Sequence, residues 1–273
     1  MKWKNLFSPV ENISPDEVRS TIKKEPSGSY QLLDVRQPKE YAASHLPGSL
    51  LIPLKELPAR ISELDSREQT IVYCASGGRS RAAAQFLKGK GFKKVFNMAG
   101  GIKAWQGRTA LGPEDVGLEF FTEEAEYSDG LALAYAMEDG LQQFYLRLAE
   151  DSTDQEQQQL LKRLAGFEDI HKKRLRDEFR QLHDAELQLP NNLPAIMEGG
   201  RRLEDFLKRA PALLHSTRDL LNLAMGLEIQ AHDLYSRMAQ QSKREQTRDF
   251  FLRIADEERQ HLNYMTEEFE KLL

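Results

Sequence analysis

Two sets of four residues, 90 positions apart, set the strongest limit on what this chain can fold into. The residues Glu138, Tyr145, Glu168 and His171 recur in the same order as Glu228, Tyr235, Glu258 and His261. Each set contains the spacings Glu-x6-Tyr and Glu-x-x-His, which place both partners on one face of a helix. The chain therefore contains an internal repeat of a helix pair.

The repeated acidic residues occupy positions where a buried apolar stripe is expected. The helix around Glu228 has apolar residues that include Ala224 and Ala231, four before and three after it, and Glu258 and His261 interrupt a stripe that begins at Phe251. Burying even one unpaired charge costs roughly several kcal/mol. Two divalent cations would balance four carboxylates, and the two histidines would add neutral nitrogen ligands. The pattern predicts a dinuclear metal site inside a helical bundle.

One Glu from each of two helices, with Glu-x-x-His from the other two, is the ligand set of ferritin-like di-metal bundles. Over about residues 127–273 the chain resembles this superfamily, most closely its rubrerythrin and bacterioferritin branch. We expect an all-α four-helix bundle with helices near 128–150, 154–185, 213–240 and 244–271. Residues 186–212 would form the long crossover, with a short helix near 201–209.

The resemblance implies a role for each residue of the repeat. Glu168 and Glu258 would bridge two metals, Glu138 and Glu228 would be terminal ligands, and His171 and His261 would each bind one metal. Tyr145 and Tyr235 would donate hydrogen bonds to the carboxylates, although plain core packing is nearly as good an interpretation. His183, His215 and His232 lie outside the repeat, and we expect them at the surface. Two iron ions are the expected cofactor, with manganese as the alternative.

Two departures from the rubrerythrin pattern affect the expected electron supply. Ala231 stands where rubrerythrins often carry an additional Glu, and there is no rubredoxin module with four cysteines. The site is thus expected to be the symmetric six-ligand type. Its electrons would come from an external donor or from sulfur carried on Cys74.

Length and composition limit the remaining possibilities. The chain has 273 residues, which suggests about two domains, and it has no stretch with the apolar length of a membrane span. Its first residues lack the apolar core of a signal peptide, so we expect a cytoplasmic protein. Residues 1–110 hold 18 Lys and Arg against 10 Asp and Glu, and the remainder holds 20 against 33. Basic and aromatic residues are not interleaved, which argues against a nucleic-acid partner.

The first 110 residues alternate predicted strands and helices. Strands are expected at 30–35, 49–54, 70–73 and 94–98, and helices at about 14 onward and 79–90. Such alternation predicts an α/β domain with a parallel sheet. The single cysteine, Cys74, directly follows the third strand.

Cys74 is a predicted nucleophile because of its position. The small residues Ala75, Ser76, Gly77 and Gly78 separate it from Arg79, where a helix begins. Such a loop can direct backbone N–H groups inward, and a helix N-terminus behind it lowers the pKa of a thiol. A buried, inert cysteine is the alternative, which the location at the carboxyl edge of a parallel sheet disfavours.

The spacing Cys-x4-Arg after a strand resembles that of the rhodanese family of sulfurtransferases. Supporting motifs span about residues 14–107 and are Leu33-Asp34-Val35-Arg36, Glu40-Tyr41, His45-Leu46-Pro47-Gly48-Ser49 and Ala99-Gly100-Gly101-Ile102-Lys103-Ala104-Trp105. Ser44 departs from the family's usual Gly before the His, which affects a turn. Related phosphatases have five residues between Cys and Arg, so the four found here indicate sulfur chemistry.

The resemblance implies that Cys74 carries sulfane sulfur as a persulfide. The loop amides of residues 75–79 would stabilise the outer sulfur, Arg79 would hold the loop or an anionic donor, and Asp34 and Arg36 would pair structurally. The expected partners are a small anionic sulfur donor such as thiosulfate or a persulfide, and a thiol acceptor.

Together these patterns predict a rhodanese-like domain at 1–110, a linker at 111–126 and a rubrerythrin-type bundle at 127–273. The expected function is a sulfurtransferase coupled to a di-iron centre for oxygen, peroxide or sulfur redox chemistry. A non-catalytic sulfur or iron sensor or scaffold, and an iron-handling protein with a docking rhodanese module, are the alternatives. We expect a homodimer, the habit of the ferritin-like family.

Overall fold

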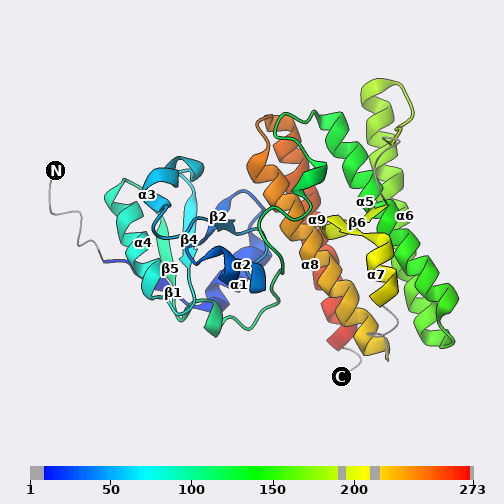
Figure 1. Ribbon diagram of the computed structural model, residues 1–273, viewed down its shortest axis with the longest axis horizontal. Helices are drawn as coiled ribbons and strands as arrows, with labels where there is room; N and C mark the ends of the chain where they lie inside the picture. Colours follow the sequence, from blue (N-terminus) through cyan, green and yellow to red (C-terminus); the bar gives the residue numbers. More distant parts are fainter. Residues whose placement is uncertain (1–8, 190–194, 210–215, 271–273) are drawn as a thin grey trace. The chain divides into compact units, whose positions relative to one another are not determined.

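The chain divides into two compact units, Met1–Glu114 and Asp115–Leu273 (Figure 1). A computed structural model describes residues 9–189, 195–209 and 216–270. His215 lies outside the described residues, so its expected surface position stays a prediction. None of the helices in the described ranges has the length and hydropathy that crossing a membrane requires.

The first unit is built on a five-stranded parallel sheet with the strand order β1-β5-β4-β2-β3. The expected parallel α/β architecture is therefore confirmed. The strands are β1 (Glu11–Ile13), β2 (Tyr30–Asp34), β3 (Leu50–Leu51), β4 (Gln69–Tyr73) and β5 (Val95–Met98). The sequence patterns did not predict β1, whose three residues are too few to show alternation and which pairs with β5, more than 80 positions away.

Helices cover both faces of this sheet, as the alternation of side chains along its central strands requires. Leu33 and Val72 pack with α4 (Gly78–Gly89) and α3 (Leu57–Arg60) in one apolar cluster. Their neighbours Leu32 and Ile71 pack on the other face with Val18 of α1 (Pro15–Lys24). The remaining short helices are α2 (Pro38–Ala43), η2 (Ile61–Glu63) and η3 (Gly101–Ala104).

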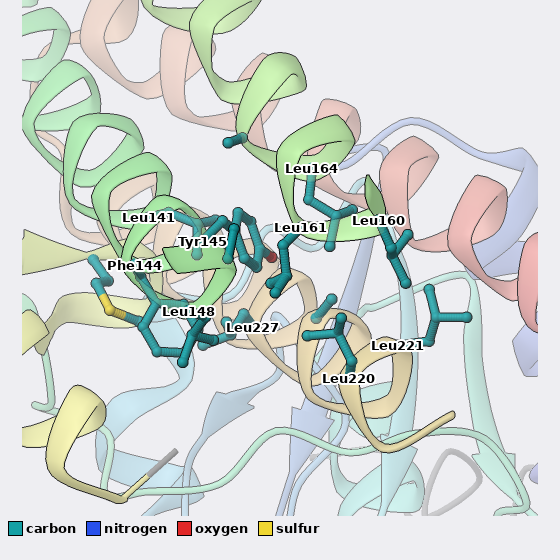
Figure 2. Close-up of a cluster of buried hydrophobic side chains, with 14 of the residues drawn as sticks. Leu141, Phe144, Tyr145, Leu148, Leu160, Leu161, Leu164, Leu220, Leu221 and Leu227 are labelled. Carbon is teal, nitrogen blue, oxygen red and sulfur yellow. The ribbon is translucent and has the colours of Figure 1, made fainter. Parts of the chain in front are cut away.

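The second unit is the expected helical bundle. Its long helices are α5 (Tyr127–Asp151), α6 (Gln155–His183), α8 (Thr217–Gln241) and α9 (Glu245–Glu270). These limits lie within a few residues of those read from the apolar stripes. Leucines from α5, α6 and α8 meet around Tyr145 in one of its two core clusters, as Figure 2 shows.

The crossover between the two helix pairs is more ordered than the sequence indicated. It contains a two-stranded ribbon of β6 (Ile196–Met197) and β7 (Arg201–Arg202), joined through η5 (Glu198–Gly200) and followed by α7 (Leu203–Arg209). Ile196 and Met197 are completely buried. The crossover is therefore part of the core of the helical unit, in addition to connecting its halves.

The predicted linker, residues 111–126, is shared between the two units. Gly112 N donates to Ala42 O within the first unit. Beyond Glu114 the chain belongs to the helical unit, where Arg237 Nη1 donates to Val116 O at 2.8 Å and Thr247 Oγ1 donates to Ala125 O at 3.1 Å. A 3-10 helix, η4 (Leu118–Phe120), lies within this stretch. The expected limits of the domains as independent folding units stay predictions.

Candidate functional sites

Cys74 lies at the carboxyl end of β4, in a loop that a second turn supports from below. Gly77 adopts φ +98°, a left-handed conformation that glycine favours, and α4 starts at the next residue. A Cβ added at Gly101 would lie only 2.3 Å from Cys74 O, so a residue with a side chain could not bring this turn so close to the loop. Ile102 N donates to Cys74 O at 2.9 Å and Lys103 N to Ala75 O at 3.1 Å. The loop is thereby held in one shape.

The Cys74 sulfur is buried and surrounded by hydrogen-bond donors. Gly77 N donates to Sγ at 3.1 Å, and Ser80 Oγ lies 3.4 Å from it. Burial alone raises the pKa of this thiol, but the hydrogen bonds from Ser80, Ser76 and Gly77 outweigh it and lower the pKa. The lowered pKa favours the thiolate, which is the nucleophilic form.

Ser80 and Glu40 complete this site, and the sequence patterns assigned a role to neither. Ser80 Oγ also lies 2.6 Å from Asn97 Oδ1, whose amide donates to Asn12 Oδ1 at 2.8 Å. The position of Ser80 on the first turn of the helix that follows the loop was the only sequence signal that could have indicated its contact with Cys74. For Glu40 the quoted Glu-Tyr motif marked the residue without indicating what it contacts.

The Arg79 side chain is engaged by Glu40, which lies 39 positions earlier in α2. Both guanidinium nitrogens donate to the carboxylate, each at 2.7 Å. The hydrogen bonds from Arg79 are the largest influence on Glu40 and lower its pKa to about 2, and the same pair raises the pKa of Arg79. Asp34 and Arg36 form a buried pair at 2.6 Å, as their structural interpretation predicted. The predicted role of Arg79 toward an anionic donor stays a prediction.

The six predicted metal ligands come together in the helical unit as two groups of three. Glu138 of α5 joins Glu168 and His171 of α6, and Glu228 of α8 joins Glu258 and His261 of α9; within each group one donor atom per residue lies within 4.8 Å of the others. All four glutamates are at least 97% buried. The offset of 90 relates the two groups, so each half of the internal repeat contributes one group of three ligands.

Each histidine directs Nδ1 at two carboxylates of its own group. His171 Nδ1 lies 3.2 Å from Glu138 Oε2 and 3.4 Å from Glu168 Oε2. His261 Nδ1 lies 3.1 Å from Glu258 Oε2 and 3.5 Å from Glu228 Oε2. The two rings stack on each other, with centroids 4.4 Å apart. These nitrogens and oxygens are the atoms that would bind a metal.

The electrostatics of the cluster show how much negative charge it concentrates. Burial and the neighbouring carboxylates raise the pKa of Glu168 and Glu258 well above its usual range. For Glu138 burial is outweighed by the hydrogen bond and charge of His171, and its pKa is lowered. Burial would lower the pKa of His261, but Glu228 and Glu258 raise it to about 11. Carboxylates in such surroundings hold protons or bind cations.

One carboxylate oxygen supports the cation interpretation directly. Glu228 Oε2 is buried, and its contact with His261 Nδ1 at 3.5 Å is too poor in geometry to satisfy it as a hydrogen bond among the described residues. A buried acceptor without a donor costs about 1–3 kcal/mol, more when it is charged. Each group offers two carboxylates and one imidazole. This donor set fits iron or manganese and so agrees with the expected cofactor.

The remaining predicted residues of this unit lie as follows. Tyr145 and Tyr235 are completely buried on α5 and α8, the helices that carry Glu138 and Glu228, and their expected hydrogen bonds to the carboxylates stay a prediction. His183 is exposed, as expected. His232 was expected at the surface, and this was wrong: it is only 6% exposed. All of residues 231–239 are buried, because α8 contacts α9 on one side and the crossover and residues 116–118 on others.

The two halves of the repeat differ around their ligands. In the first half the buried Lys172 Nζ donates to Asp139 Oδ1 at 2.7 Å and to Gln142 Oε1 at 2.5 Å. The offset of 90 places Leu262, Ile229 and His232 at the corresponding positions. His232 Nε2 is buried and has no hydrogen-bond partner among the described residues, and burial lowers its pKa to about 4. The repeat thus conserves the ligand types and changes their surroundings.

Comparison with known families gives a match for each unit. Residues 14–108 match the rhodanese-like domain, and residues 219–272 match rubrerythrin. Both matches contain residues singled out above, Cys74 and Arg79 in the first and the second ligand group in the other. The rubrerythrin match covers α8 and α9, the second helix pair of the helical unit, and rubrerythrin has a ferritin-like fold.

Individual relatives match the first unit. A sulfurtransferase of Allochromatium vinosum is 38% identical over 85 residues, which cover 30% of this chain and 79% of that protein. The putative sulfur carrier protein YrkF of Bacillus subtilis is 43% identical over 81 residues, covering 30% of this chain and 44% of that one. A rhodanese-like domain protein of Staphylococcus aureus aligns with a TM-score of 0.34 at 28% identity, covering 37% of this chain and 98% of that structure.

The chain belongs to the rhodanese-like family through its first unit. It spans less than half the length of the Bacillus subtilis protein.

Proposed function

We propose that this protein is a sulfurtransferase that carries sulfane sulfur as a persulfide on Cys74, joined to a bundle that binds two iron ions. The donor-lined Cys74 sulfur carries the first half of the proposal. The two buried Glu–Glu–His groups carry the second.

The transfer proceeds in two displacement steps at sulfur. The Cys74 thiolate attacks the outer sulfur of the donor; a new S–S bond forms, the donor's S–S bond breaks, and sulfite or a thiolate leaves with the bonding electron pair. An acceptor thiolate then attacks the outer sulfur of the persulfide, and the Cys74 thiolate leaves. No net oxidation occurs. Gly77 N–H and Ser80 Oγ stabilise the thiolate before the first step and after the second.

The test of the sulfur half is Cys74→Ser in the full chain. Because Cys74 is the only cysteine, the variant should lose both the persulfide detected by mass spectrometry after incubation with donor and the transfer to a thiol acceptor. Metal content should equal that of the parent. Transfer that survives in this variant would exclude Cys74 as the carrier.

In the helical unit the residues that would hold the metals are Glu138, Glu168 and His171 in one group and Glu228, Glu258 and His261 in the other. By the resemblance, Glu168 and Glu258 would be the ligands that both ions share. Bound iron would supply redox chemistry toward oxygen or peroxide. The chain's own part is to bury the carboxylates, to present both histidines through Nδ1 and to keep bulk water from the core.

Metal content after anaerobic purification tests this half of the proposal. The parent should hold about two irons per chain, and a double variant, Glu168→Ala with Glu258→Ala, should hold none while keeping its helical circular dichroism. Glu257→Ala, which removes a neighbouring carboxylate outside both groups, is the matched control and should keep both ions. A parent that binds no metal when iron is plentiful would overturn the assignment.

Coupling between the two centres is supported by their presence in one chain, and an external electron donor follows from the single cysteine. The homodimer is supported by the habit of the ferritin-like family. Many irons bound per chain would favour the iron-handling alternative.

A further inference from the structure

The helices that carry the two histidines face each other along an antiparallel seam. We define the α6–α9 seam by three facing pairs, Phe167 with Tyr264, His171 with His261, and Arg174 with Glu257. The aromatic rings meet edge to face with centroids 5.8 Å apart, the imidazoles stack, and Arg174 donates to Glu257. The histidine pair therefore lies between an aromatic pair and an ion pair.

Among the six ligand side chains, the two histidines at this seam are the most exposed. The glutamate side chains are 1–4% exposed, whereas His171 is 12% and His261 is 27% exposed. Phe167 and Tyr264, one turn along the helices, are 37% and 51% exposed. The surface nearest to the ligand cluster is thus made of the histidine rings and the aromatic pair.

The opposite side of the cluster, between α5 and α8, is covered by the crossover. Gly140 lies two residues after Glu138, and a Cβ added there would be 1.9 Å from Ile196 O. Gln230 lies two residues after Glu228, and a Cβ added at Gly199 would be 2.7 Å from the Cβ of Gln230. The described backbone of the crossover is therefore packed against both helices within two residues of a ligand.

From this asymmetry we propose that the α6–α9 seam is the access route to the metal centre, and that Phe167 and Tyr264 form a rim that admits small uncharged molecules. The inference rests on the proposed metal binding and adds the path and the class of reactant. The rim offers ring edges, and Arg174 and Glu257 neutralise each other, so neither of these two pairs adds a net charge that would attract an ion. The carboxylates behind it repel anions.

The experiment compares the access of two probes to ferrous protein under anaerobic conditions. Bipyridine is a bulky chelator whose iron complex absorbs visible light, and nitric oxide is a small uncharged ligand with its own ferrous spectrum. Each second-order rate constant is taken from the dependence on probe concentration. The variants are Phe167→Ala and Tyr264→Ala, and the matched control is Leu146→Ala, which removes a comparably exposed apolar side chain from α5.

We expect both rim variants to lose iron to bipyridine several-fold faster than the parent, and Leu146→Ala to behave as the parent. Nitric oxide should bind at nearly the same rate in all four proteins, because the intact rim already admits it. Iron release that is independent of bipyridine concentration, or equal in rim and control variants, would overturn the route. A parent that binds no iron would instead overturn the proposed function, so the two failures are distinguishable.

Discussion

Both terminal nitrogens of Arg79 are bound by the two carboxylate oxygens of Glu40, so the only charged side chain of the Cys74 loop is already paired. The pair is partly exposed, with each side chain about one third accessible. The pairing should weaken the binding of an anionic sulfur donor, because the Glu40 carboxylate offsets the positive charge that a dianion such as thiosulfate would meet at Arg79.

Removing that carboxylate with Glu40→Gln should lower the KM for thiosulfate. A partly exposed ion pair is worth up to about 1 kcal/mol, which corresponds to a change of up to about fivefold. Steady-state kinetics at low and high salt would measure it. Glu63→Gln, which removes a partner of Arg60 away from the loop, should leave KM unchanged. A fall in kcat with constant KM would show instead that the pair serves only to hold the loop.

The Ser80 hydroxyl should account for part of the lowered pKa of Cys74. Ser80→Ala removes a hydrogen bond to the thiolate, which is worth roughly 1–2 kcal/mol, so the pKa should rise by about one unit. The ultraviolet absorbance of the single thiolate as a function of pH measures this directly. Ser76→Ala is the control, because Ser76 acts through its backbone N–H. Equal pKa values in the two variants would contradict the assignment.

Gly140 should tolerate no side chain. Its Cβ would overlap Ile196 O, so Gly140→Ala must displace the crossover, and we expect the free energy of unfolding to fall by more than about 2 kcal/mol. Gly166→Ala on α6 points into open space and should raise it by roughly 0.5–1 kcal/mol. Urea unfolding of the metal-free proteins would compare them. Similar values for the two variants would show that the crossover does not pack closely on α5.

His232 should make the helical unit sensitive to acid. Its pKa is lowered to about 4 in the folded protein from an ordinary value of 6.5, mainly by burial. Between these values the unfolded chain binds the extra proton, so the stabilisation is complete above pH 6.5 and is lost as the pH falls toward 4. The groups that interact with it electrostatically are Asp233, Asp256 and Arg259.

The variant His232→Gln, which introduces the residue found at the corresponding position 142, should remove this contribution. Between about pH 7 and pH 5 the parent should lose about 2 kcal/mol more of its unfolding free energy than the variant does. Urea unfolding at both pH values is the measurement. Parallel losses in parent and variant would place the acid sensitivity in other groups.

Local patterns in the sequence were enough to predict the two architectures and to single out the six candidate ligands. Helix periodicity and the offset of 90 are local properties of the chain, so they predicted α5, α6, α8 and α9 to within a few residues and placed each Glu-x-x-His on an inward face. The loop of Cys74 was likewise recognisable because a strand, four residues and an arginine are contiguous.

Contacts between distant residues were decided only by the tertiary structure. Glu40 meets Arg79 because α2 and the Cys74 loop converge at one edge of the sheet, which no local pattern encodes. The crossover packs closely on α5 because Gly140 lacks a side chain where Ile196 passes. His232 is buried because packing from several sides extends beyond the apolar stripe of α8. Periodicity indicates which face of a helix is apolar, and only the packed partners determine how much more of that helix is covered.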